Sequence, residues 1–271
     1  MIRTSPPIAL TIAGSDCSGG AGIQADLKTF TALGVYGAIV ITALTAQNTR
    51  GVTAIHRVPA DFIEAQFAAV TSDLAIAAVK TGMLGDVATV MTVAALLSRM
   101  NPMHLVVDPV MVATSGARLL DESAVAAVRD HLIPLASVIT PNLPEAAALL
   151  QMAVAVTEDQ MRRQAKQLLA LGCGAVLLKG GHADGTEAVD ILVSADGSEH
   201  RFSQPRIATR NTHGTGCSLA AAITAGLAQG MGLPAAVQHA KDFVWQALKS
   251  GADFHIGTGN GPIDHLFNVR K

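Results

Sequence analysis

The sequence predicts an α/β fold, in which a mainly parallel central sheet is covered by helices on both faces. Short apolar stretches rich in β-branched residues alternate with longer amphipathic or alanine-rich stretches along most of the chain. Strands that are apolar along their whole length are buried on both faces, which is typical of parallel sheets between two helical layers. No linker, low-complexity run or internal repeat interrupts the 271 residues, so we expect a single domain spanning residues 1–271.

The elements follow from this pattern in chain order. Strands are predicted at residues 8–13, 38–43, 75–80, 105–108, 137–140 and 175–179. Helices are predicted at residues 21–33, 61–72, 86–99, 121–131 and 157–171. The order then changes, because residues 187–203 indicate a hairpin with its turn at Ala195-Asp196-Gly197. Two helices, at about 215–230 and 234–250, and a polar tail complete the chain.

Composition argues against several classes of protein. The net charge is -2 and aromatic residues make up 3% of the chain, so residues for phosphate neutralisation and base stacking on nucleic acid are scarce. Cys17, Cys173 and Cys217 are far apart, which argues against a zinc site and a disulfide framework. The early Pro6-Pro7 pair argues against a signal peptide, and no uninterrupted apolar stretch is long enough to span a membrane. We therefore expect a cytoplasmic protein.

Polar and glycine residues follow every predicted strand, where open α/β sheets bind their ligands. Two sequence motifs that bind nucleotides can be looked for in this chain. Residues 20–25 match a degenerate dinucleotide fingerprint, but no acidic residue lies between Asp26 and Asp61, where the ribose ligand belongs. A P-loop requires a Gly-Lys pair, and the sequence has none. Both observations argue against these two ways of binding a nucleotide.

The segment 209–223, TRNTHGTGCSLAAAI, is the most informative for function. Gly214, Thr215 and Gly216 open a predicted helix, whose N-terminal N–H groups attract phosphate or another anion. Cys217 lies in the first turn, where the same field lowers the pKa of a thiol. An anion site and an activated thiol suggest transfer of a phosphoryl group. A tight turn with a buried structural cysteine is the alternative.

A family resemblance supports the first interpretation. Asn142-x-x-Glu145, Lys179 and the late glycine turn resemble the ribokinase-type kinases. Cysteine in place of their usual aspartate resembles the hydroxymethylpyrimidine and phosphomethylpyrimidine kinases of thiamine biosynthesis, as do four longer stretches: AGSDCSGGAGIQADLKTF at 13–30, TPNLPEA at 140–146, LLKGGH at 177–182 and NTHGTGC at 211–217. The resemblance implies a ribokinase-like three-layer α/β/α fold and a homodimer. It also implies ATP-dependent phosphorylation of 4-amino-5-hydroxymethyl-2-methylpyrimidine and then of its monophosphate.

Beside the resemblance, the chemistry of the residues suggests the following roles at the phosphate end. Cys217 takes the proton of the substrate hydroxyl, and the backbone N–H groups of 214–217 stabilise the transferred phosphoryl group. Asn142 and Glu145, one helical turn apart, suit a water-mediated Mg²⁺ site. The residues expected near ATP are Lys179, Asp108, Thr212 and Asn142. The alternatives are a first-turn helix acid for Glu145, a turn acid for Asp108 and a surface charge for Lys179.

The pyrimidine is expected to contact the first half of the chain. The Gln47 amide carries a donor and an acceptor, which match an aminopyrimidine edge. Asp26 and the backbone of Ala13 and Gly14 are expected beside it, and Met83 and Val110 against the ring. Asp26 has an alternative role as a helix acid paired with Lys28 or another base.

Two other functions stay open from the sequence. Some related pyridoxal kinases carry a second cysteine in the loop after residues 108–111, whereas this chain has Ala113, Thr114 and Ser115 there, which favours the pyrimidine. A pyridoxal or pyridoxine kinase is one alternative, and a non-catalytic nucleotide-binding relative is the other. His213 is expected to be structural or close to the phosphates, and Cys17 and Cys173 to be structural.

Overall fold

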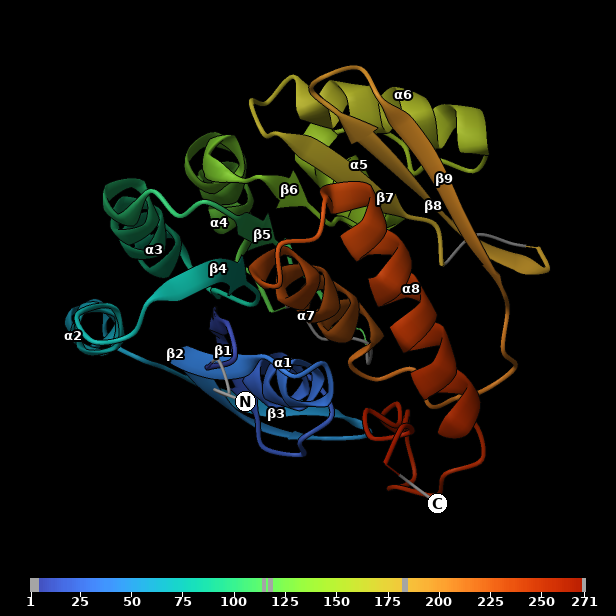
Figure 1. Cartoon of the computed structure of the whole chain (residues 1–271), viewed down its shortest axis with the longest axis horizontal. Coiled ribbons are helices and arrows are strands. Elements are labelled where there is room, and N and C mark those ends of the chain that lie inside the picture. The colour runs from blue at the N-terminus through green and yellow to red at the C-terminus, as the bar shows by residue number, and fades with distance from the viewer. Residues whose placement is uncertain (1–4, 114–115, 117–118, 182–184, 270–271) are drawn as a thin grey trace.

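The computed structural model describes residues 5–113, 116, 119–181 and 185–269. Its strands form one nine-stranded sheet in the order β3-β2-β1-β4-β5-β6-β7-β8-β9 (Figure 1). The strand pairs from β2 to β7 are parallel, and β3, β8 and β9 join antiparallel at the two edges. This arrangement confirms the prediction of a mainly parallel sheet in an α/β fold.

The strands are β1 (Ile8–Asp16), β2 (Tyr36–Asn48), β3 (Gly51–Arg57), β4 (Ile76–Thr81), β5 (Leu105–Val107), β6 (Val138–Ile139), β7 (Ala175–Lys179), β8 (Glu187–Ser194) and β9 (Glu199–Pro205). The helices are α1 (Gly22–Ala32), α2 (Ala60–Thr71), α3 (Val87–Met100), α4 (Glu122–Ala127), α5 (Leu143–Leu150), α6 (Glu158–Leu169), α7 (Thr215–Ala228) and α8 (Leu233–Ser250). After α4 the chain continues through a π turn at Val128–Leu132 and a 3₁₀ turn at Ile133–Leu135. The six predicted strands, the hairpin and the seven predicted helices are therefore present, with ends shifted by a few residues. Strand β2 extends five residues beyond its predicted end, and the predicted 121–131 helix is split between α4 and the π turn.

Helices α2 to α6 cover one face of the sheet, and α1, α7 and α8 cover the other (Figure 1). Successive side chains of a strand point to opposite faces and so enter different cores. In β5, Leu105 and Val107 pack in the core beneath α2 to α6, whereas Val106 packs with α7 and α8. Because both faces are buried, the strands are apolar throughout, as the sequence indicates.

Two elements lie outside the sequence prediction. Strand β3 is largely exposed and pairs with β2, so it lacks the continuous apolar pattern of a buried strand. Helix α5 is short, and its start is marked by the Asn142 cap. The tail after α8 is irregular but partly packed, since His265 is buried and its Nε2 lies 2.8 Å from the Ser218 hydroxyl. No helix of the described residues is both long and apolar enough to cross a membrane.

Candidate functional site

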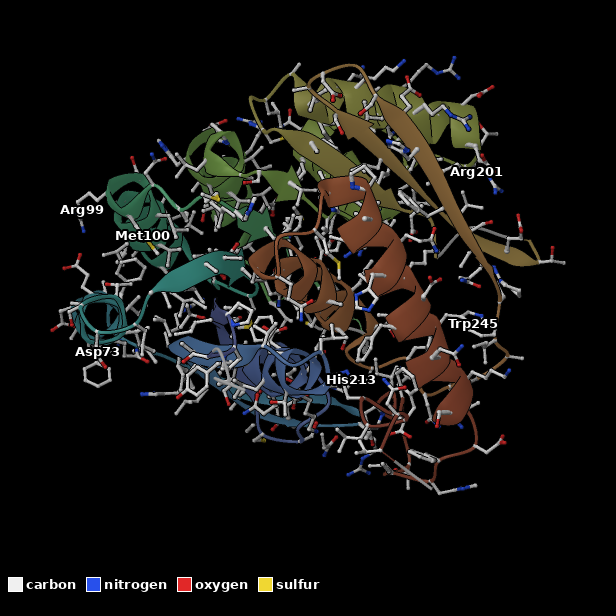
Figure 2. All side chains as sticks on the ribbon, in the orientation of Figure 1. Asp73, Arg99, Met100, Arg201, His213 and Trp245 are labelled. Atoms are coloured by element: carbon white, nitrogen blue, oxygen red, sulfur yellow. The ribbon has the colours of Figure 1, made fainter. Side chains whose placement is uncertain are left out.

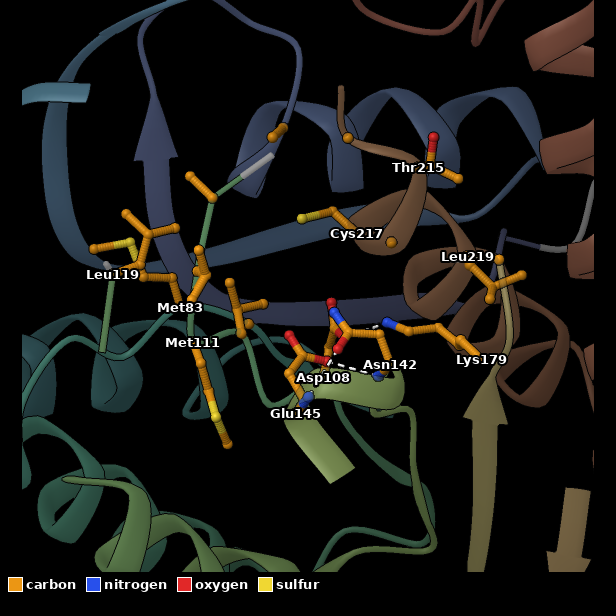
Figure 3. A pocket seen from close by; sticks show the side chains of 18 of the residues that line it. Met83, Asp108, Met111, Leu119, Asn142, Glu145, Lys179, Thr215, Cys217 and Leu219 are labelled. Carbon is orange, nitrogen blue, oxygen red and sulfur yellow. Dashed lines mark hydrogen bonds and ion pairs between the residues drawn. The ribbon is translucent and has the colours of Figure 1, made fainter. Parts of the chain in front are cut away.

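A cavity of about 1010 Å³ opens at the carboxyl ends of the parallel strands (Figure 3). It is lined from the first half of the chain by Ala13, Gly14, Gln47, Met83, Asp108 and Val110. From the second half it is lined by Asn142, Glu145, Lys179, Thr212, Gly214, Thr215, Gly216 and Cys217. The fold therefore brings all but one of the residues predicted for the site around one space. The exception is Asp26.

The glycine turn before α7 forms one wall of the cavity. Gly214 caps the helix with φ +83°, a left-handed conformation that favours glycine, and α7 begins at Thr215. A side chain at Gly214 would also overlap the carbonyl oxygen of Gly20. Figure 3 shows Thr215 and Cys217 on the first turn, above the cavity. The first turn of α7 thus faces the space where an anion would lie.

The environment of Cys217 contradicts the expected effect of the helix end on its thiol. Burial, opposed by the Lys80 ammonium and reinforced by the carboxylates of Asp26 and Asp108, raises the pKa of Cys217 to about 11. This direction is opposite to the one expected from the position of the thiol at a helix N-terminus. At neutral pH only about one molecule in 10⁴ would carry the thiolate. Cys217 is therefore a thiol in the ligand-free site.

Lys179 and Asp108 form an ion pair at the floor of the cavity, drawn as a dashed line in Figure 3. Lys179 Nζ lies 3.0 Å from Asp108 Oδ1, which also accepts a hydrogen bond from the Thr140 hydroxyl. Burial lowers the pKa of Lys179, but Asp108 and Glu145 outweigh this effect and raise it, so the ammonium stays charged. Because the Lys179 side chain is only 13% exposed, the alternative of a surface charge is wrong.

Asn142 and Glu145 form a capping box at the start of α5. Asn142 Oδ1 accepts from the Glu145 backbone N–H, and Glu145 Oε2 accepts from the Asn142 backbone N–H, both at 2.8 Å. Burial, together with the charge of Asp108, raises the pKa of Glu145 to about 7, against the effect of Lys179. Both Glu145 and Asp108 line the cavity, so a cation between them would relieve the repulsion of two carboxylates. Among the described residues no group of three or more His, Cys, Asp or Glu side chains could hold a metal ion.

Another part of the cavity wall combines the apolar side chains of Met83 and Val110 with the amide of Gln47. Met83 is buried, and its carbonyl accepts from the Gly14 N–H and from the Thr42 hydroxyl. A Cβ atom at Gly14 would lie 3.1 Å from Met83 Sδ, so glycine keeps the space open. Gln47, near the end of β2, and Val110 line the same region. Apolar side chains and a side-chain amide therefore meet in this part of the wall, as is typical of pockets for small molecules.

Asp26 does not line the cavity, contrary to the prediction that it binds substrate. Its carboxylate is fully buried, both oxygens accept from Lys80 Nζ at 2.8 Å, and the Thr11 hydroxyl donates to one of them. The expected alternative, a helix acid paired with Lys28 or another base, is confirmed with Lys80 as the base, since Lys28 donates instead to the carbonyl of Gly19. A buried carboxylate needs a charged partner, and Lys80 supplies it. Lys80 lines the cavity where Asp26 had been expected.

Three parts of the wall escaped the sequence reasoning. Lys80 is the second-last residue of β4 and lies two positions before Gly82, whereas Lys179 ends β7 directly before Gly180. His213 Nε2 lies 2.7 Å from Asp16 Oδ2. The cavity also extends along β9 and α8 to Trp245, whose indole N–H donates to the carbonyl of Pro205 (Figure 2). No local pattern marks these contacts, because each joins segments distant in sequence.

Comparisons with known proteins identify the family of the chain. The family model described as phosphomethylpyrimidine kinase matches residues 16–264. The hydroxymethylpyrimidine/phosphomethylpyrimidine kinase of Escherichia coli (strain K12) is 52% identical over 258 residues, which cover 95% of this chain and 97% of the relative. The solved phosphomethylpyrimidine kinase from Clostridium difficile 630 gives a TM-score of 0.80 at 44% identity, covering 89% of this chain and 99% of that one. An ADP complex of Bacillus subtilis pyridoxal kinase gives a TM-score of 0.90 at 38% identity, covering 98% and 100%.

The three-layer fold and the cavity at the strand ends define a kinase of the ribokinase-like class. Within that class, the solved structures named above include a pyridoxal kinase and a phosphomethylpyrimidine kinase. The family model and the Escherichia coli relative both carry the name phosphomethylpyrimidine kinase. The chain belongs to the phosphomethylpyrimidine kinase family. The resemblance stated from the motifs is therefore confirmed.

Proposed function

We propose that this protein transfers a phosphoryl group from ATP to the hydroxymethyl group of 4-amino-5-hydroxymethyl-2-methylpyrimidine and then to the resulting monophosphate. One observation carries the proposal. A single cavity joins a ring end, lined by Gln47 and Met83, to a phosphate end, lined by Lys179 and the first turn of α7. Cys217 lies on that first turn, where the hydroxyl of a ring at the ring end would meet the terminal phosphate.

At the phosphate end, positive charge and backbone donors suit a polyphosphate. Lys179 neutralises phosphate oxygens, and the N–H groups of Gly216 and Cys217, at the start of α7, bind the charge that develops on the transferred group. Asn142 and Thr212 line the same region and would contact the nucleotide. Arginine, lysine or backbone donors of this kind supply most of the catalysis in phosphoryl transfer.

Glu145 and Asn142 would hold Mg²⁺ through water, with Asp108 as a second carboxylate nearby. This ion keeps several waters and takes few carboxylates, which matches a site with two acidic side chains rather than a cage. When bound, it would neutralise charge on the phosphate oxygens. The capping box would fix the orientation of the Asn142 and Glu145 side chains. The start of α5 and the metal site would therefore depend on the same two side chains.

At the ring end, Gln47 would bind the amino group and ring nitrogen, and Met83 and Val110 would contact the ring faces. Ala13 and Gly14 supply backbone beside it. Cys217 would accept the hydroxyl proton as a thiolate, a minority species because of its raised pKa. Lys80 assists, since its ammonium favours the thiolate.

Pyridoxal is a second candidate substrate, because the chain resembles a pyridoxal kinase closely in structure. Thr114 and Ser115, which argue against it from the sequence, lie outside the described residues. ATP consumption should be measured with the hydroxymethylpyrimidine, its monophosphate, pyridoxal and ribose, each with Mg²⁺. We expect turnover with the first two to exceed that with ribose at least tenfold. Equal or faster turnover on ribose would contradict the proposal.

We also propose a single-domain, cytoplasmic homodimer. Cys17, Cys173 and Cys217 are free thiols, which supports a reducing compartment. Leu44 and Ile55 are exposed on the ribbon formed by β2 and β3, and apolar side chains on such a ribbon support pairing with a second copy. Sedimentation of the purified protein would test the dimer, because a monomer across the micromolar range would contradict it.

A further inference from the structure

The chain after α8 runs back along the outside of the site. Residues 251–265, which we call the tail segment, lie beside the turn between β2 and β3 and beside the loop that precedes α7 (Figure 1). None of the residues 251–265 lines the cavity. Several of them are nevertheless buried, namely Gly251, Gly261, Ile263, Asp264 and His265. The tail segment is therefore packed on the molecule and contacts the walls of the cavity from behind.

The first attachment of the tail segment is to the loop before α7. Asn211 is buried, and its side-chain NH₂ donates to the carbonyls of Gly251 and Phe254, at 2.7 and 2.9 Å. The His213 backbone N–H donates to the carbonyl of Gly261 at 3.0 Å. A Cβ atom at Gly261 would overlap Asn211 Oδ1, so tail and loop are in close contact there. Because this loop leads directly into the glycine turn, the tail segment supports the backbone from which α7 begins.

The second attachment is to the turn after β2. The Gly259 N–H donates to Thr49 Oγ1 at 3.1 Å, and the Asn260 N–H donates to the Thr49 carbonyl at 2.9 Å. A Cβ atom at Gly257 or Gly259 would overlap Thr49, so glycine permits this close approach. Thr49 follows Gln47 by two positions, just beyond the end of the strand that brings Gln47 to the cavity wall. The tail segment therefore also supports the ring end of the cavity.

These two attachments join parts of the wall whose direct contact is weak. Gln47 Nε2 and His213 Nε2 are 3.5 Å apart, which is beyond the usual length of a hydrogen bond. By contrast, the consecutive residues 259–261 of the tail segment contact both Thr49 and Asn211. The end of β2 and the loop before α7 are far apart in sequence, and the tail segment bridges them.

We propose that the tail segment sets the position of the ring end relative to the phosphate end, with Asn211 and Thr49 as the positioning residues that hold it. The inference rests on the proposed function, in which the hydroxyl of the bound ring attacks the terminal phosphate of ATP. A misplacement of about 1 Å between reacting groups can cost about 100-fold in rate. Each end keeps its own lining residues when the tail is displaced. Displacement should therefore slow the transfer and leave the binding of each ligand nearly unchanged.

The test is the steady-state kinetics of monophosphate formation from the hydroxymethylpyrimidine, ATP and Mg²⁺. Gly261→Ala places a methyl group against Asn211 and should displace the tail segment from the loop before α7. We expect kcat to fall at least tenfold, with the KM values for ATP and for the pyrimidine within about threefold of wild type. Gly232→Ala is the matched control, because it adds the same methyl group where no atom lies within 4 Å. It should keep the wild-type kcat.

A second pair of variants tests the attachment at the ring end. Thr49→Val keeps the shape of the side chain but removes the oxygen that accepts from the Gly259 N–H, whereas Thr49→Ser keeps that oxygen. Valine should lower kcat about two- to tenfold, the range for one hydrogen bond, again with both KM values nearly unchanged. Serine should keep the wild-type kcat. Rescue by serine would show that the hydrogen bond, rather than the packing of the side chain, holds the tail segment.

The outcomes separate this inference from the proposed function. A wild-type protein that forms no monophosphate overturns the proposed function and the inference with it. If the wild type is active and Gly261→Ala keeps its kcat, only the inference is overturned. The same holds if the KM values rise while kcat stays, because the tail segment would then support binding alone. Thermal unfolding reports whether each variant folds, and should Gly261→Ala not fold, the comparison of Thr49→Val with Thr49→Ser decides.

Discussion

Replacing Cys217 with alanine should impair the first phosphorylation more than the second. The first nucleophile is a neutral hydroxyl whose proton must leave as the new bond forms, and a general base typically contributes 10²–10⁴-fold to such a step. The second nucleophile is a phosphate monoester, already mostly ionised at pH 7 because its second pKa is about 6. The backbone donors at the start of α7 survive the substitution and should continue to serve both steps.

The structure adds a pH dependence to this prediction. The pKa of Cys217 is raised to about 11, so the active thiolate is scarce at pH 7 and increases about tenfold with each pH unit until the pH approaches that value. The first step should therefore accelerate from pH 7 to pH 9 by up to about 100-fold, whereas the second, whose nucleophile is already ionised, should change little. Cys217→Ala should remove the rise in the first step.

Monophosphate and diphosphate formation should be measured separately, each from its own starting substrate, between pH 6 and pH 9. Cys217→Ser is the matched control, since it keeps a similar side chain that does not ionise usefully in this range. It should lose the rise with pH as alanine does. If both steps fall by the same factor in Cys217→Ala, the residue acts through packing or phosphate positioning, and its role as a base is wrong.

Three further predictions concern the ring, the core and the metal. Gln47→Ala should raise the KM for the pyrimidine roughly ten- to a hundredfold by leaving a buried polar edge unpaired, at a cost of about 1–3 kcal/mol, and a raised KM for ATP alone would place Gln47 at the wrong end of the cavity. Lys80→Met should lower the free energy of unfolding by about 3–5 kcal/mol, because it leaves the charge of the fully buried Asp26 without its partner. Chemical denaturation measures the loss, and the double variant with Asp26→Leu should recover much of it. Equal stability of Lys80→Met and wild type would refute this. Glu145→Gln should raise the Mg²⁺ concentration needed for half-maximal activity about tenfold, since one of two carboxylates is lost; no change in that concentration would show that Glu145 acts as a helix cap alone.

Much of the architecture could be predicted because it depends on near neighbours in the chain. A strand such as β7 is buried on both faces, so all its positions are apolar, and the pattern is visible without its partners. The start of α7 is marked in the same way by glycines before an alanine-rich run. Strand β3 could not be predicted in this way, since it is exposed and is a strand only because β2 lies beside it.

The same distinction between local and long-range features applies to the residues of the site. The residues at the strand ends could be named from the sequence, because parallel strands must end at one edge of the sheet. The roles of Asp26 and the thiol of Cys217 could not, because they depend on charge and burial contributed by distant segments. Lys80 neutralises Asp26 across 54 positions of sequence, and Asp26 and Asp108 act together with burial on Cys217.

The α/β class, the succession of buried strands along the chain, the glycine turn that opens α7 and the family of the chain all follow from the residues in order. Which charges meet, among them Lys179 with Asp108 and His213 with Asp16, follows only from the folded structure. The reason is physical. Backbone conformation and amphipathic pattern are local properties, whereas ion pairing, burial and the pKa of a buried group depend on what the fold brings within a few ångströms.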